Sequence, residues 1–221
     1  MRNILCLLSI VLFSSHCINP YETIIIEKPI VIIDPGHGGV DGGATGLKNI
    51  SEKHLNLSTA MKLYDLMILT GYDVKLTRNT DDDTDGEIGF NKRSDILNRE
   101  NIGNNYPEAL YLSIHMNSST SSKDKGFQVF YGNKNENSLL LAQSIYDEMY
   151  KSDLATRMRE VKVAPNTVYL MKSLKNPCVL IECGFIKNVE DFALLSNSVY
   201  RQKLALIFLS ATNNYLSKVA E

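Results

Sequence analysis

Residues 30–37 have the sequence IVIIDPGH, in which four apolar residues precede an aspartate, a proline, a glycine and a histidine. A continuous apolar run of this length, closed by a residue that interrupts regular structure, predicts a buried β-strand. Proline suits the end of a strand because it has no N–H group to donate to a neighbouring strand. We therefore expect a buried strand that ends at Asp34 and Pro35 and is followed closely by His37.

The rest of the chain alternates between helical and strand-like patterns. Apolar residues recur at helical spacing in four segments, residues 52–70, 90–101, 138–150 and 199–216. Short apolar runs predict further strands at residues 74–76, 109–114, 126–131, 168–171 and 178–181. Strands that alternate with helices of these lengths indicate βαβ crossovers. The expected fold is a single α/β domain, with a mostly parallel, twisted sheet that has a mixed edge and helices on both faces.

The composition favours an ordinary globular protein. A length of 221 residues suits one domain, because a single hydrophobic core can serve up to about 250 residues. Hydrophobic residues make up 44% and charged residues 22% of the chain, which argues against a disordered protein and against a multispanning membrane protein. The net charge of -2 gives no general attraction to nucleic acid, so no nucleic-acid partner is expected.

The N-terminal segment, residues 1–20, has the pattern of a signal peptide. Arg2 precedes a short apolar run, and a polar stretch of small residues follows it. The run is shorter than the roughly 20 residues that a membrane-spanning helix needs, so an uncleaved anchor is the weaker alternative. Cys17 offers a site for lipid attachment, but His16 and Ser14 fit a lipoprotein cleavage site poorly. We expect export across the cytoplasmic membrane.

Two further segments complete the expected domain organisation. Residues 21–29 form a lead-in, in which the three isoleucines at 24–26 fit either a short edge strand or an irregular stretch. Residues 30–221 are expected to form the one main domain, without internal repeats or a linker to a second domain.

Three predicted strands end in residues that can bind a metal ion or move protons. The first strand leads to His37, the segment LYLSIH ends at His115, and the segment VLIE ends at Glu182. In open α/β sheets the carboxyl ends of the strands form the crevice in which ligands bind. We therefore expect these three side chains to converge.

A fourth candidate, Glu52, lies at the start of the helix that follows a glycine-rich loop. Ser51 before it is a residue type that caps helices with its side chain, and the positive end of a helix stabilises a carboxylate. The glycines between His37 and Glu52 permit turns that can bring the two residues together. Two histidines and one glutamate are the ligand set of a catalytic zinc. We expect one Zn²⁺ per chain, held by His37, Glu52 and His115.

Glu182 is then free to act as the general base and acid. A catalytic zinc lowers the pKa of its water to about 7, and a carboxylate that is not a ligand can pass the proton to the leaving amine. The alternative for Glu182 is a carboxylate held in a salt bridge at the end of a strand.

Three other residues have side chains of a type that binds zinc. His54 lies two residues after Glu52, so on a helix it would point to another face. Cys178 and Cys183 share one strand-like run that holds them about 16 Å apart, too far for a disulfide. Single thiols in an apolar strand are usually small core residues, and we expect none of the three to bind the metal.

With these motifs the chain resembles the zinc-dependent N-acetylmuramoyl-L-alanine amidases of the amidase-3 type. The resemblance extends from Ile30 to Leu216. It rests on the segments VIIDPGHGGVDGGATG, SEKHLNL, TGYDVKLTR, RSDILN, LYLSIHMNSS and PCVLIECGFIKNVED, which occur in this order. It implies hydrolysis of the amide bond between N-acetylmuramic acid and L-alanine in peptidoglycan, whose glycan strands with stem peptides would be the substrate.

The resemblance also implies roles for individual residues. The zinc ligands of the family fall on His37, Glu52 and His115, and its catalytic glutamate falls on Glu182. Two residues in matching segments are expected to bind substrate. They are Asn117, which follows the second histidine, and Arg93. Two departures are a lengthened connection at residues 101–107 and the cysteine at position 183, and neither changes an expected ligand.

Within the family, a short domain behind a signal-like segment is similar to the germination-specific amidases of the spore cortex. That similarity implies removal of stem peptides before muramic-δ-lactam forms, and action in the forespore intermembrane space or the cell wall. Because wall-binding repeats are missing, we expect a protein partner or the compartment itself to confine the enzyme. The alternatives are a vegetative autolysin with the same bond specificity, another zinc peptidase such as a carboxypeptidase, and a noncatalytic wall-binding module on the same fold.

Overall fold

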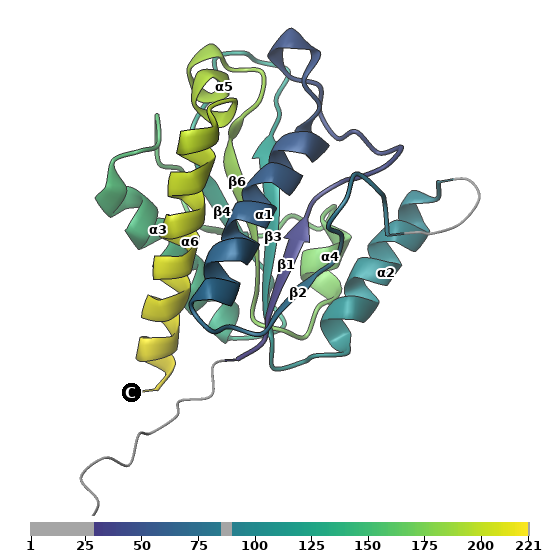
Figure 1. Cartoon of the computed structure of the whole chain (residues 1–221), viewed down its shortest axis with the longest axis vertical. Coiled ribbons are helices and arrows are strands. Elements are labelled where there is room, and N and C mark those ends of the chain that lie inside the picture. Colours follow the sequence, from purple (N-terminus) through teal and green to yellow (C-terminus); the bar gives the residue numbers. More distant parts are fainter. Residues whose placement is uncertain (1–28, 85–89, 221) are drawn as a thin grey trace, which may run out of the picture.

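A computed structural model describes residues 29–84 and 90–220 of the chain (Figure 1). Its sheet has six strands in the order β2-β1-β3-β6-β4-β5. The strands are β1 (Val31–Pro35), β2 (Val74–Leu76), β3 (Leu110–Asn117), β4 (Gln128–Tyr131), β5 (Lys162–Val163) and β6 (Cys178–Phe185). Strands β2, β1, β3 and β6 are parallel, whereas β4 runs antiparallel to β6. The prediction of a mostly parallel sheet with a mixed edge is confirmed.

Helices cover both faces of this sheet (Figure 1). They are α1 (Glu52–Leu69), α2 (Lys92–Asn104), α3 (Asn137–Ser152), α4 (Tyr169–Ser173), α5 (Val189–Leu195) and α6 (Ser198–Val219), and a short 3₁₀ helix, η1 (Leu47–Asn49), lies in the glycine-rich loop. Helix α6 packs between α1 and α3, and α2 packs against α4 on the opposite face.

The alternation of side chains along β1 explains why the sheet needs this double cover. Val31 and Ile33 belong to the larger hydrophobic core, which contains residues of α1, α3 and α6. Ile32 points the other way, into the smaller core with residues of α2 and α4. All three side chains are fully buried. A strand buried on both faces reads as a continuous apolar run, which accounts for the pattern in the sequence.

One predicted strand is wrong. The segment 168–171 was expected to be a strand, but the chain forms helix α4 there. Leu170, Met171 and Leu174 are buried together in the smaller core, a spacing that fits a helical turn. A short apolar run cannot be assigned to helix or strand from its pattern alone. Helix α5, strand β5 and η1 were not predicted, and each is short.

Several expectations for the N-terminus lie outside the described residues. They concern the signal peptide at 1–20, the lead-in with its isoleucines, and Cys17. Among the helices that the structure describes, none is both long and apolar enough to span a membrane.

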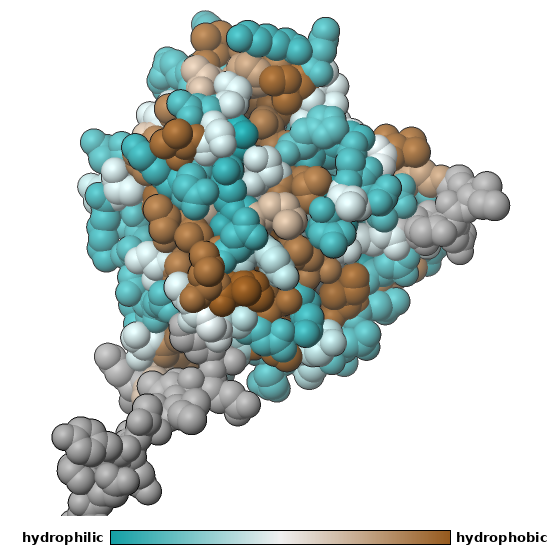
Figure 2. All heavy atoms as spheres, viewed as in Figure 1, coloured by the Kyte–Doolittle hydropathy of each residue, from teal (hydrophilic) through white to brown (hydrophobic). Residues whose placement is uncertain are grey.

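Cys178 and Cys183 are buried free thiols, as expected. On the face formed by α1 and α6, hydrophobic residues lie in separate patches among hydrophilic ones (Figure 2).

Candidate metal centre

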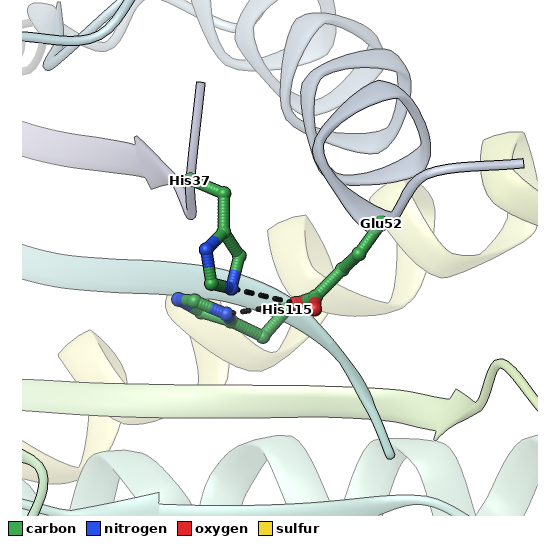
Figure 3. Close-up of side chains that lie close together, drawn as sticks. All are labelled: His37, Glu52 and His115. Atoms are coloured by element: carbon green, nitrogen blue, oxygen red, sulfur yellow. Dashed lines mark hydrogen bonds and ion pairs between the residues drawn. The ribbon is translucent and has the colours of Figure 1, made fainter. Parts of the chain in front are cut away.

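The structure brings the three predicted metal ligands together (Figure 3). His37 follows β1, His115 lies in β3, and Glu52 is the first residue of α1. Their potential ligand atoms all lie within 4.8 Å of one another. The Oε1 atom of Glu52 is 3.3 Å from Nε2 of His37 and 3.0 Å from Nδ1 of His115. The two imidazole rings meet edge to face, with their centroids 5.0 Å apart.

The parallel pairing of β1 with β3 sets the position of both histidines. Pro35 pairs with Ile114, and the N–H of Gly36 donates to the carbonyl of Ile114 over 3.0 Å. A Cβ atom at position 36 would lie 2.1 Å from the ring of His115, so only glycine leaves room for that ring. The next residue, His37, has a left-handed backbone with φ of 61°. This turn directs its ring back toward β3 and α1.

The glycine-rich loop then returns the chain to the same place. Gly43 has a φ of +64°, and a Cβ atom there would lie 2.7 Å from both Oε2 of Glu52 and the ring of His37. The N–H of Ala44 donates to Oε2 of Glu52 over 2.9 Å. Ser51 occupies the N-cap position of α1, but its side chain makes no capping hydrogen bond. The prediction that Ser51 occupies the N-cap position is confirmed, but the predicted hydrogen bond from its side chain is wrong.

The surroundings of Glu52 keep its carboxylate charged. Oε1 accepts hydrogen bonds from the backbone N–H of Met116 and from the side chain of Asn56, both over 3.2 Å. Burial would raise the pKa of Glu52, but its hydrogen bonds with His115 and His37 outweigh burial and hold the pKa well below its usual range. The carboxylate form is the one that binds a cation.

Asp41 orients the ring of His37. Its Oδ2 lies 2.9 Å from Nδ1 of His37, while its Oδ1 accepts from the N–H of Gly43 over 3.1 Å. This contact leaves Nε2 of His37 directed at Glu52. Burial lowers the pKa of His37, but Glu52 and Asp41 outweigh it and raise the pKa to about 9. A carboxylate on the far nitrogen is typical of histidines that bind zinc. Sequence reasoning did not single out Asp41.

A buried arginine holds the backbone beneath the histidine. Arg99 of α2, which is 3% exposed, donates to the carbonyl of His37 over 2.8 Å and to that of Pro35 over 3.0 Å. It also pairs with the buried carboxylates of Asp34 and Asp95, at 2.5 and 3.0 Å. The arginine thus links α2 to the loop that carries His37. Nothing in the sequence pattern alone identifies this role.

Glu182 lies on the strand next to His115, and the two residues are paired in register. With His37 and His115 it lines a cavity of about 290 Å³. Its Oε2 is buried and has no hydrogen-bond partner among the described residues. Burial raises the pKa of Glu182 to about 7. A carboxyl group with a pKa near neutrality can both accept and return a proton.

The two predicted substrate-binding residues lie outside this cluster. Asn117 ends β3, where its carbonyl accepts from the N–H of Ile186 over 2.9 Å, and it is not among the residues that line the cavity. Arg93 is exposed in the first turn of α2 and lines an adjoining hollow. His54 is exposed and lies beside Asp81, away from the three clustered residues, as expected.

Comparison with known proteins identifies the family. The family model Amidase_3, described as N-acetylmuramoyl-L-alanine amidase, matches residues 31–213. The germination-specific N-acetylmuramoyl-L-alanine amidase of Bacillus subtilis (strain 168) is 36% identical over 184 residues, which cover 81% of this chain and 76% of that protein. The amidase LytC of the same organism is 32% identical over 196 residues, 86% of this chain but only 37% of LytC.

A solved structure agrees with these relatives. The CwlD amidase from Clostridioides difficile, in complex with the GerS lipoprotein, superposes with a TM-score of 0.79 at 35% sequence identity. The match covers 86% of this chain and 99% of that chain. The family model, the relatives and the solved structure each match most of this chain. The chain therefore belongs to the Amidase_3 family and is an N-acetylmuramoyl-L-alanine amidase that acts on peptidoglycan.

Proposed function

We propose that this amidase hydrolyses the bond between N-acetylmuramic acid and L-alanine with one zinc ion, which is held by His37, Glu52 and His115. The observation that carries the proposal is the convergence of these three donors within 4.8 Å, in a cavity that Glu182 also lines.

The donor set fits zinc. Two imidazoles and one carboxylate are the protein ligands of many catalytic zinc sites, in which a fourth position stays open. When bound, zinc supplies a Lewis acid for the scissile carbonyl and lowers the pKa of water to about 7. Glu52 is held in its charged form, and Asp41 keeps Nε2 of His37 turned toward Glu52. These contacts orient the ligands before any metal arrives.

Glu182 carries the proton in this proposal. Its carboxylate accepts a proton from the attacking water and delivers it to the departing nitrogen of L-alanine. The pKa of about 7 that burial gives Glu182 suits both steps. Its Oε2 has no hydrogen-bond partner among the described residues, so no described protein group competes with the reactants for that oxygen.

Product analysis tests the reaction. Purified protein, stripped with a chelator and reloaded with zinc, should release stem peptides with a free N-terminal alanine and leave the disaccharide intact. Activity should vanish on chelation and return with zinc. Cleavage within the stem peptide would instead indicate a carboxypeptidase, and no release by the zinc-loaded protein would refute the proposal.

We also propose that the enzyme works in maturation of the spore cortex. The support is the similarity to the germination-specific amidase of Bacillus subtilis and to CwlD of Clostridioides difficile. Mass spectrometry of cortex fragments from a strain lacking this protein should show retained stem peptides and no muramic-δ-lactam. A change confined to the vegetative wall would favour an autolysin.

Export and a protein partner complete the proposal. We expect residues 1–20 to direct export and the mature enzyme to begin shortly after Cys17, in the forespore intermembrane space or the cell wall. N-terminal sequencing of the exported protein tests this, and Met1 retained in a cytosolic fraction would contradict it.

The solved CwlD was in complex with a lipoprotein, which supports a partner here. Digestion of intact wall by the purified protein alone, at the rate of repeat-bearing amidases, would make that partner unnecessary.

Asn117 and Arg93 remain the proposed substrate-binding residues. Arg93 is better placed, because it lines a hollow that adjoins the cavity with the three clustered residues. Replacing Arg93 should raise KM more than replacing Asn117 does, and the opposite order would contradict this ranking.

A further inference from the structure

The cavity beside the metal centre has two chemically different sides. The proposed chemistry uses the side formed by the strand ends, with His37, His115 and Glu182. The other side, which we call the α2–α4 wall, consists of Lys92 and Ile96 of α2 and of residues 167–170 at the start of α4. This wall is largely apolar, and the proposed chemistry gives it no role.

The wall continues into a second hollow. That hollow is lined by Arg93 and Leu97, together with Lys92, Ile96 and Tyr169. The last three residues line the cavity as well, so the two spaces form one groove that leads from the metal centre along α2. Tyr169 stands where they meet. Helices α2 and α4, which carry the groove, lie next to each other on one face of the sheet (Figure 1).

Tyr169 is exposed but rigidly supported. The residue is 50% exposed, whereas the following residues Leu170 and Met171 are buried in the smaller core. At the other end of α4, Leu174 packs so close to α2 that a Cβ atom at Gly103 would lie 2.3 Å from it. An exposed aromatic ring on a fixed support can bind a ligand with little loss of conformational entropy.

We propose that the α2–α4 wall, with Tyr169 at its centre, is the subsite that binds the stem peptide of the substrate. The inference rests on the proposed function, because it assigns a position to one part of that substrate. A groove with an apolar wall suits an extended peptide that begins with alanine, whose methyl group can pack against Tyr169 and Ile96.

The charges at the groove also favour the peptide over the glycan. A stem peptide carries carboxylates, whereas the disaccharide is neutral once the lactyl group is in amide linkage. Lys92 and Arg93 supply two exposed cations along the groove. The Nζ atom of Lys92 lies 3.6 Å from Oδ2 of Asp41. The guanidinium group of Arg93 has no carboxylate oxygen within 4.0 Å in the part of the chain that the structure describes. Because its exposed side chain lines the groove, Arg93 is placed to meet a carboxylate of the peptide.

The test compares variants on substrates of graded peptide length. The substrates are disaccharides that bear a tetrapeptide, a dipeptide or a single alanine, with zinc-loaded enzyme throughout. Tyr169→Ala should raise KM for the tetrapeptide substrate by about tenfold, because the loss of one aromatic contact weakens binding by about this factor. The rise in KM should be smaller for the substrate with a single alanine, and kcat should change little. Tyr169→Phe keeps the aromatic ring and should raise KM for the tetrapeptide substrate less than Tyr169→Ala does. The matched control is Tyr150→Ala, because Tyr150 is 67% exposed on α3, on the other face of the sheet.

A second variant tests the charge. Arg93→Gln should raise KM more for a stem peptide with a free side-chain carboxylate than for the same peptide with that carboxylate amidated. An unchanged KM in both variants would overturn the proposal, and so would a rise that follows glycan length instead of peptide length. Failure of the proposed function would look different, because the unaltered enzyme would then release alanine-terminated peptide from none of the substrates.

Discussion

At the scale of single residues, the carboxylate of Asp41 orients the ring of His37, one of the three proposed zinc ligands. It holds Nδ1 of His37 at 2.9 Å and so fixes which ring nitrogen faces Glu52. Removing such a partner typically costs 10- to 100-fold in metal affinity. We predict that Asp41→Ala lowers zinc affinity by about this factor and leaves the fold intact, as measured by titration against a competing chelator.

The control for this variant is Asp65→Ala, which removes an exposed carboxylate of α1 away from the site. Both variants lose one negative charge. If they bind zinc equally well, Asp41 does not orient the ligand.

The buried pair of Asp34 and Arg99 makes stability depend on pH. Burial would raise the pKa of Asp34, but Arg99 and hydrogen bonds from Ser113 and Thr77 outweigh it, so the pKa lies below its usual value of 3.8. The stabilisation from this charge is complete above that usual value and is lost as the pH falls through the lower folded-state pKa. Asp34→Asn should therefore flatten the decline of the free energy of unfolding in acid.

At neutral pH the same variant should lose about 3–5 kcal/mol, because it leaves the charge of Arg99 buried without a full partner. Urea unfolding at pH 7 and at pH 3 measures both effects. A variant with unchanged stability at pH 7, or with the same acid slope as the unaltered protein, would refute this role for the pair.

The three proposed zinc ligands and the proposed catalytic glutamate can be predicted from the sequence, because each has a local signal. His37, His115 and Glu182 each follow an apolar run, and Glu52 begins a helix. Asp41 and Arg99 have no such signal. The contact between Arg99 and the carbonyl of His37 joins residues 62 positions apart, and only the folded chain defines it.

At the scale of secondary structure, α4 shows where local patterns mislead. Its apolar residues fit a strand and a helical turn equally well, and the choice depends on packing against α2. That packing is tight at Gly103, where a Cβ atom would lie 2.3 Å from Leu174, a fully buried residue. Helix α4, for which the sequence predicts a strand, thus forms one wall of the cavity.

We predict that Gly103→Ala destabilises the protein by about 1–3 kcal/mol through overpacking and raises KM by displacing α4. Gly71→Ala is the comparison, since a Cβ atom there meets nothing within 4 Å. Its left-handed backbone costs about 1–2 kcal/mol, but no neighbour is displaced, so KM should stay normal. Denaturant unfolding with a parallel kinetic assay measures the difference. A Gly103 variant with normal KM and normal stability would show that α4 does not need this close contact.

At the scale of the whole molecule, the order of the strands creates the site. Strands β1, β3 and β6 are neighbours and parallel, which brings together His37 after β1, His115 and Glu182. The last two residues pair within their strands, because β3 continues to Asn117 and β6 to Phe185, beyond the strand ends expected from the sequence. The alternation of strands and helices in the sequence predicts the parallel sheet. The predicted mixed edge is present, but the sequence does not predict the strand order or that β4 is the antiparallel strand, because both depend on contacts between distant segments.

Zinc content and turnover, measured together in variants of His37, Glu52, His115 and Glu182, test the proposed metal centre directly. Replacing His37, Glu52 or His115 by alanine should lower both quantities, because in the proposed site each residue would supply a bond to the metal. Glu182→Gln keeps the shape of the side chain and all three ligands, but it cannot take up a proton. It should bind about one zinc ion and lose roughly two orders of magnitude or more in turnover. Loss of zinc from Glu182→Gln would make Glu182 a ligand, and near-normal turnover with zinc bound would remove it from the mechanism.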